Sequence, residues 1–218
     1  MADNVQIWAD KLRTFDTDAR QNMEDGALTK GYKANAEEMC AILNRALCSE
    51  YVAFLQYRHH YFMASDIHRG EIAEEFKQHS EDELNHATEI AGRIQMLGGV
   101  PIHQLGEIER VSPIRVDYGH NLRNMMEEDL IDERAAIDFY REIVRYAGNN
   151  DPVTREMFED ILAVEEEHAD DWANYLFEVD PSTNKVIPDL HQAVMSQLGA
   201  AFPLPPQQSR QQPGQMAQ

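Results

Sequence analysis

The chain has 218 residues, of which 27% are charged and 8% are aromatic, and its formal net charge is −20. This length suits one substantial hydrophobic core, or at most two small ones. The negative charge argues against nucleic acid as a partner, because affinity for DNA depends on Lys and Arg side chains that neutralise phosphates. It favours the attraction of cations, although much of it can equally be an ordinary solvated exterior.

Cys40 and Cys48 are the only two cysteines. Eight residues apart on one helix, they lie about 12 Å apart along the axis, too far for a disulfide. Two lone thiols fit a reducing cytoplasm. The first twenty residues lack the apolar core of a signal peptide, and no apolar run reaches the roughly 18 residues of a membrane helix. We therefore expect a cytoplasmic protein without a membrane partner.

Residues 1–35 are interpreted as an N-terminal extension. Apolar residues at positions 5, 8 and 12 have helical spacing, so we expect a helix that docks either on the rest of the chain or on a neighbouring subunit. Acidic residues outnumber basic ones in this segment, which makes it a poor DNA-binding arm.

Four long helices follow between residues 36 and 178. Gly98 and Gly99, with Pro101 beyond them, end the second helix, while Asp151 and Pro152 have the residue types of a helix start. The helices are predicted at about 35–64, 69–97, 119–147 and 152–178.

The long connection between the second and third helices needs a reason, because such loops are uncommon in compact domains. About twenty extended residues reach about 66 Å, more than the length of a 30-residue helix. The third helix can therefore start at the far end of the molecule. The sequence thus predicts an all-α four-helix bundle with one long crossover. We further expect a segment at 179–202 with a short helix at 189–198, and a disordered tail at 203–218.

The chain contains a Glu-x-x-His motif twice, as Glu83 with His86 and as Glu165 with His168. Three residues turn through about 300° on a helix, so each carboxylate and imidazole share one face. Of the nine histidines, only these two follow a Glu at this spacing. A carboxylate oxygen and a neutral imidazole nitrogen form half of a site for iron, manganese or zinc.

Two further glutamates stand at matching offsets. Glu50 precedes Glu83 by 33 residues, and Glu133 precedes Glu165 by 32 residues. The midpoints fall at residues 66–67 and at 149, both in turn-forming segments, so each pair lies at one height on antiparallel helices. The chain therefore consists of two similar halves, and four carboxylates and two imidazoles are predicted to meet at one level.

Other candidate residues have ordinary interpretations. We expect Met125 and Met126 in the core, Cys48 as a small buried residue, and Asp129 as a carboxylate near the site rather than a ligand. His79 is expected at the surface, although it lies one turn before Glu83. Surface or interface positions are expected for five other histidines, which are His59, His60, His103, His120 and His191.

Several stretches of the chain resemble bacterioferritin: residues 50–57, 83–87, 140–147 and 165–168. The resemblance covers roughly residues 36–178 and combines motif, order and spacing. Bacterioferritins are hollow homo-oligomers that oxidise Fe(II) at a di-iron ferroxidase centre and store Fe(III) mineral inside. The resemblance therefore implies a ferritin-like bundle, ferroxidase activity, iron storage and protection against oxidative stress.

The resemblance also implies a role for each matching residue. Glu50 and Glu133 would be terminal ligands, Glu83 and Glu165 would bridge the two irons, and each histidine would bind one iron. Tyr57 matches a tyrosine that can supply an electron. The implied metal ligands are Glu50, Glu83, His86, Glu133, Glu165 and His168, and these residues with Tyr57 form the implied catalytic set.

The chain departs from bacterioferritin in three places. Leu84 stands where bacterioferritin has the methionine that holds haem, so haem is not expected. The 50 residues from Glu83 to Glu133 and the N-terminal extension are closer to Dps-like proteins with a bacterioferritin-type centre, called DpsL or thioferritins. Those proteins form twelve-subunit cages and often prefer peroxide, but Cys40 and Cys48 do not match their cysteine pair. A 12-mer or a 24-mer, O2 or H2O2, and iron or manganese stay open at this point.

Two other classes of function compete with a ferroxidase cage. The first is a stand-alone redox enzyme on the same bundle, such as a rubrerythrin-like peroxidase or a manganese catalase. The chain lacks the Cys-x-x-Cys pairs of an attached rubredoxin domain. The second is a DNA-compacting protein, which the net charge disfavours.

Overall fold

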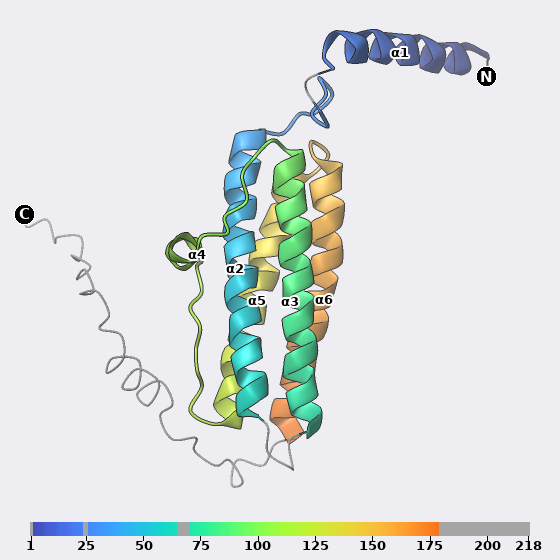
Figure 1. Cartoon of the computed structure of the whole chain (residues 1–218). Helices are drawn as coiled ribbons and strands as arrows, with labels where there is room; N and C mark the ends of the chain where they lie inside the picture. Colours follow the sequence, from blue (N-terminus) through green and yellow to red (C-terminus); the bar gives the residue numbers. More distant parts are fainter. Residues whose placement is uncertain (1, 24–25, 65–69, 179–218) are drawn as a thin grey trace, which may run out of the picture.

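The computed structural model describes residues 2–23, 26–64 and 70–178. Four long helices run along one bundle axis, and α2 packs mainly on α3 while α5 packs mainly on α6 (Figure 1). This confirms the predicted all-α bundle and its crossover. The largest difference from the predicted helix ends is at the start of the third helix, expected at Gly119 and observed at Leu122. The four helices are α2 (Ala36–Met63), α3 (Gly70–Met96), α5 (Leu122–Ala147) and α6 (Pro152–Glu178).

Side-chain caps determine where three of these helices begin. The Asn35 side chain accepts hydrogen bonds from the first backbone N–H groups of α2, and Asp151 accepts one from Thr154 in α6. In α5 the cap is Asn121, two residues after Gly119. Gly119 has a φ of +62°, a left-handed conformation that a right-handed helix excludes, which explains the later start.

The crossover runs from the end of α3 along α2 to the opposite end of the bundle (Figure 1). It contains a short helix, α4 (Leu105–Val111), that the sequence analysis did not predict. Ile108 of α4 is buried against Cys48 and Val52 of α2, which gives this helix its apolar anchor. The Asn44 side chain also holds the start of the crossover, because it accepts a hydrogen bond from the Ile102 N–H at 2.8 Å.

The N-terminal helix α1 (Ala2–Gln21) projects away from the bundle (Figure 1). It extends well beyond the helical pattern recognised at positions 5–12. Its large apolar side chains are exposed, from 51% for Ile7 to 71% for Val5. The expected docking on the bundle is therefore not observed. The predicted helix at 189–198 and the tail at 203–218 lie outside the described residues.

Besides the small cluster around Ile108, two larger apolar clusters lie along the bundle axis. One cluster, towards the start of α2, includes Met39, Leu43, Ile90 and Phe158. The other, towards the start of α5, includes Phe76, Met125, Met126, Leu130 and Trp172, which confirms the two methionines as core residues. Cys48 is fully buried, as expected. Among the described helices, none combines the length and apolarity that a membrane span requires.

Asp151 joins three parts of the chain at one end of the bundle. Its carboxylate accepts hydrogen bonds from Arg93 of α3 at 2.6 Å, from the Thr154 hydroxyl at 2.6 Å and from the Tyr32 hydroxyl at 3.0 Å. Burial alone would raise the pKa of Asp151, but the hydrogen bonds from Thr154 and Tyr32, together with the Arg93 charge, hold it below its usual value.

Replacing Asp151 by Ala should destabilise the fold by about 3 kcal/mol, because the change removes a helix cap and leaves the largely buried Arg93 without its counter-ion. Guanidinium unfolding of the metal-free protein at fixed protomer concentration measures this effect. Asp160→Ala is the matched control, since Asp160 is exposed on the same helix. Equal unfolding midpoints for the two variants would contradict a structural role for Asp151.

Candidate metal centre

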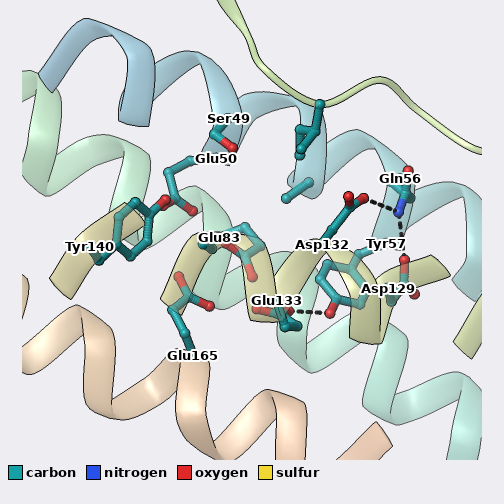
Figure 2. Close-up of a pocket in the computed structure, with 13 residues that line it drawn as sticks. Ser49, Glu50, Gln56, Tyr57, Glu83, Asp129, Asp132, Glu133, Tyr140 and Glu165 are labelled. Atoms are coloured by element: carbon teal, nitrogen blue, oxygen red, sulfur yellow. Dashed lines mark hydrogen bonds between the residues drawn. The ribbon is translucent and has the colours of Figure 1, made fainter. Parts of the chain in front are cut away.

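Six polar side chains from all four long helices meet in the interior between the two apolar clusters. Each is at most 6% exposed. Figure 2 shows the carboxylates of four of them directed toward a common space. The residues are Glu50 from α2, Glu83 and His86 from α3, Glu133 from α5, and Glu165 and His168 from α6.

Their ligand atoms form two overlapping groups. In the first, Nδ1 of His86 lies 3.2 Å from Glu165 Oε1, 3.6 Å from Glu83 Oε2 and 3.7 Å from Glu50 Oε2. All four residues offer ligand atoms within 4.8 Å of one another. Nitrogen and carboxylate oxygen donors at these separations suit one divalent transition-metal ion.

The second group repeats this arrangement around His168. Its Nδ1 lies 3.4 Å from Glu83 Oε1, 3.4 Å from Glu165 Oε2 and 3.5 Å from Glu133 Oε1. These ligand atoms also fall within 4.8 Å of one another. Glu83 and Glu165 belong to both groups and direct different oxygens to each. Two cations, one in each group, would therefore share these two carboxylates.

The unsatisfied polar atoms at the centre fit a pair of bound ions. Within the described chain, Nδ1 of His86, Nδ1 of His168 and both carboxylate oxygens of Glu165 are buried without a hydrogen-bond partner. Such atoms are costly in a core unless something binds them. Two cations between the imidazoles and the shared carboxylates would satisfy all four atoms at once.

In the absence of ions, the charges at the centre are balanced by protons. Burial, and then repulsion from Glu165, raise the pKa of Glu83 well above its usual value and that of Glu133 to about 8. Burial alone would lower the pKa of both imidazoles, but the surrounding carboxylates outweigh it and raise the pKa of His86 and His168. Burial would raise the pKa of Glu165, yet these two imidazoles lower it.

Two tyrosines link the halves of the bundle at this level. The Tyr57 hydroxyl donates to Glu133, and the Tyr140 hydroxyl donates to Glu50. Each tyrosine therefore holds the outer glutamate of the opposite half of the chain. Trp172 Nε1 in turn donates to the Tyr57 hydroxyl at 2.8 Å. These contacts orient the two outer carboxylates before any ion binds.

The role of Tyr140 was missed in the sequence analysis, although a signal was present. Tyr57 follows Glu50 by seven residues, and Tyr140 follows Glu133 by seven residues. Applying the internal repeat to this spacing would have paired the two tyrosines. Trp172 had no comparable signal, because a tryptophan on a helix is an ordinary core residue.

Asp129 lies beside the centre but belongs to neither group of ligand atoms. It accepts hydrogen bonds from Gln56 Nε2 at 2.8 Å and faces His60 Nδ1 at 2.9 Å. The other ring nitrogen of His60 lies 2.9 Å from the Asp117 carbonyl oxygen in the crossover. The expectation of a surface or interface position for His60 is wrong, because the side chain is fully buried among α3, α5 and the crossover.

The expectation of a surface position for His79 is also wrong, since the side chain is only 1% exposed. It lies one turn before Glu83 and shares the inward face of α3. Its ring stacks on that of His168, with 3.8 Å between the centroids. Burial, followed by the nearby His168, lowers the pKa of His79 to about 2, so the ring is neutral.

The other side chains singled out in the sequence lie outside the two groups. His59 is half-buried and packs edge-on against Tyr118. His103 and His120 are exposed, as expected, and His191 lies outside the described residues. Both cysteines are free and buried, and neither contributes to a cluster of potential metal ligands in the part of the chain described.

Cation binding at this centre should release protons. The imidazoles and Glu133 hold protons in the free protein and must lose them to act as ligands, so affinity should rise with pH between about pH 6 and pH 8. The slope should be on the order of tenfold per pH unit for each proton released. Calorimetric titration with Co(II) in two buffers of different ionisation enthalpy measures the proton count. A heat independent of the buffer would contradict this charge balance.

The ferritin-like domain family matches residues 40–180. A bacterioferritin of Rhodobacter capsulatus is 33% identical over 129 residues, which cover 59% of this chain and 76% of that protein. A nutrient stress-induced DNA-binding protein of Synechococcus is 33% identical over 142 residues, which cover 64% of this chain and 81% of that protein.

Among solved structures, a dodecameric thioferritin of Bacteroides fragilis, described as bacterioferritin-related, superposes with a TM-score of 0.63. It is 26% identical, and the match covers 79% of this chain and 94% of that one. The family match spans more than half of the chain, and the sequence relatives confirm the resemblance to bacterioferritin. The chain therefore belongs to the ferritin-like domain family and is related to the bacterioferritins.

Proposed function

We propose that this protein is a ferroxidase that oxidises Fe(II) with O2 or H2O2 at a di-iron centre inside each subunit. The product, Fe(III), would be stored as mineral within a hollow homo-oligomeric cage. The observation that carries this proposal is the pair of ligand groups that share Glu83 and Glu165, each group with its own imidazole nitrogen that no described residue hydrogen-bonds.

Each of the six residues has a role in this proposal. Glu50 and Glu133, each held by a tyrosine, are the terminal ligands, one for each iron. Glu83 and Glu165 bridge the two irons. His86 and His168 each bind one iron through Nδ1. Four carboxylates offset the charge of two divalent ions, and they stabilise Fe(III) further because its charge is higher.

Two adjacent Fe(II) substrates supply two electrons in one event. Reduction of H2O2 to two molecules of water consumes two electrons and two protons, and reduction of O2 to H2O2 consumes the same number. Pairing the electrons avoids the release of one-electron oxygen radicals. The chain contributes by holding both ions at one height, and Glu83 and Glu133, whose pKa values burial raises, give up their protons when the ions bind.

Tyr57 is proposed as a source of an additional electron. Its hydroxyl donates to Glu133, accepts from Trp172 and is buried, so the ring contacts the centre without exposure to solvent. Burial, together with the charge of Glu133, raises the pKa of Tyr57, which keeps the phenol protonated until it is oxidised.

A cage is supported by the dodecameric assembly of the Bacteroides relative and by the exposed apolar face of α1. A helix with five large apolar side chains in solvent is typical of a surface that another molecule covers. That relative is described as a dodecamer, which favours twelve subunits over twenty-four in the proposed cage. Haem is not part of the proposal, because Leu84 carries no ligand atom.

The alternative of a stand-alone peroxidase or catalase uses the same centre without a cage. DNA binding is a second alternative, since the Synechococcus relative bears that name. The net charge of −20 opposes it, and α1 does not supply a basic arm. A gel shift at low and at moderate salt separates DNA binding from the proposed function.

Replacing Glu83 by Gln should slow Fe(II) oxidation by at least about tenfold, because the bridging carboxylate loses its charge and one ligand oxygen. Stopped-flow absorbance after mixing with O2 or with H2O2 measures the rate, and the faster oxidant is thereby identified. Glu81→Gln is the control, since Glu81 is exposed on the same helix. Wild-type rates in the Glu83→Gln variant would remove the basis of the proposal.

Replacing Tyr57 by Phe should leave the binding of two irons unchanged. Rapid-freeze EPR spectra of this variant during Fe(II) oxidation should lack the tyrosyl radical signal expected for the wild-type protein.

The purified protein should assemble into a closed shell and fill it with iron. Native mass spectrometry gives the number of subunits, and electron microscopy after Fe(II) addition in air should show round particles with dense centres. Truncation of residues 2–21 should lower the assembly state or stability if α1 covers a neighbouring subunit. A monomer or dimer that oxidises iron without a mineral core would favour the stand-alone enzyme.

A further inference from the structure

A second cluster of potential ligands lies beside the dinuclear centre, between α3 and α6. Glu75, His79 and Asp171 offer ligand atoms within 4.8 Å of one another. Nε2 of His79 lies 3.2 Å from Glu75 Oε1 and 3.8 Å from Asp171 Oδ2. None of these three residues is among the six that the proposed function uses.

His79 is the residue that distinguishes this cluster from an ordinary acidic surface. It is almost completely buried, and its Nδ1 has no hydrogen-bond partner in the described part of the chain. Its ring lies nearly parallel to that of His168, at an interplanar angle of 17°. One edge of the His79 ring therefore faces the carboxylates of Glu75 and Asp171, while its flat side covers His168, a potential ligand of the dinuclear centre.

The cluster opens into a surface hollow of about 340 Å³. Glu75 and Asp171 are partly exposed there, with 27% and 38% of their side chains accessible. Asp82 lies in the same wall, with Oδ2 3.7 Å from Nε2 of His168. The hollow is lined by Glu75, Gln78, His79, Asp82, Val164, Glu167, His168 and Asp171. Four of these eight residues are acidic, which concentrates cations at this position.

His79 and His168 thus separate the hollow from the dinuclear centre. His168 lines the hollow and also belongs to the second ligand group of the centre. His79 offers a ligand atom within 4.8 Å of those of Glu133 and His168 as well. A cation held by Glu75, His79 and Asp171 would therefore be next to the centre, yet in contact with solvent.

We propose that Glu75, His79 and Asp171 bind a third divalent cation in this hollow. One imidazole and two carboxylates are a donor set for Fe(II), Mn(II), Co(II) or Zn(II). Three protein ligands leave coordination positions for water, which makes the ion exchangeable. The Tyr175 hydroxyl lies 3.4 Å from Glu75 Oε2 and helps to orient the Glu75 carboxylate.

In the working protein this ion is Fe(II) in transit between solvent and the dinuclear centre, and that identity rests on the proposed function. The existence of the cation site does not depend on the proposed function. The two claims therefore need separate measurements, one of where ions bind and one of whether iron is oxidised.

Redox-inert Zn(II) tests where ions bind. Crystals of the full chain, loaded with about three Zn(II) per subunit, should show anomalous density between Glu75, His79 and Asp171 in addition to two peaks at the dinuclear centre. Calorimetric titration of the same protein should give about three sites per subunit, and about two for the double variant Glu75→Gln/Asp171→Asn.

The matched control is Glu71→Gln/Asp170→Asn, which removes the same two charges from exposed positions on the same two helices. It should retain the third site. Circular dichroism and native mass establish that both variants fold and assemble. If a variant fails to fold, the anomalous map of the wild-type protein decides alone.

An empty cluster in the wild-type map at this loading would overturn the third site, and so would equal occupancy in the Glu75→Gln/Asp171→Asn crystal. Two filled positions at the centre with an empty cluster would reject this inference and leave the ferroxidase proposal intact. A filled cluster in a protein that does not oxidise Fe(II) would reject the ferroxidase proposal and leave the third site intact.

Discussion

The burial of four carboxylates at one height in a helical core is the constraint on which the structure depends. Each anion removed from water costs several kcal/mol unless an opposite charge or a proton offsets it. In the metal-free protein, that offset comes from the two imidazoles and from protons on Glu83 and Glu133, whose pKa values burial raises. The apolar clusters on either side fix the height at which the charges meet. Four long helices are needed, because a single helix could not place all six side chains around one space.

The internal repeat explains how the outer and shared carboxylates differ. Tyr57 and Tyr140 stand at equivalent positions in the two halves, and each bonds the outer glutamate of the other half. Glu50 and Glu133 are therefore oriented by neighbours, whereas both oxygens of Glu165 have no hydrogen-bond partner within the described residues. The crossed pairing also ties the two helical hairpins together at the level of the site. Stability and site geometry consequently depend on the same contacts.

Much of this arrangement could be predicted from the sequence, because helical periodicity determines which residues share a face. The spacing of Glu83 and His86 and the repeat were sufficient to bring six side chains together. Periodicity does not determine how far a polar residue lies from solvent, and for this reason His60 and His79 were assigned to the surface. His60 is covered by a crossover whose path depends on tertiary contacts such as those of Ile108. The apolar face of α1 is likewise exposed within the described part of the chain, which the helical pattern of its residues could not show.

The two sides of the bundle differ in ways that bear on how ions and small molecules reach the centre. The crossover covers the α2 side, where the cavity beside Glu50, Tyr140 and Ile114 has a volume of only about 20 Å³ (Figure 2). That volume accommodates roughly one water molecule and excludes a hydrated cation. The α3–α6 side instead has an acidic hollow of about 340 Å³ that ends at the ring of His168. Room and charge therefore favour cation entry past His79, while the covered side has space only for a molecule the size of water or O2.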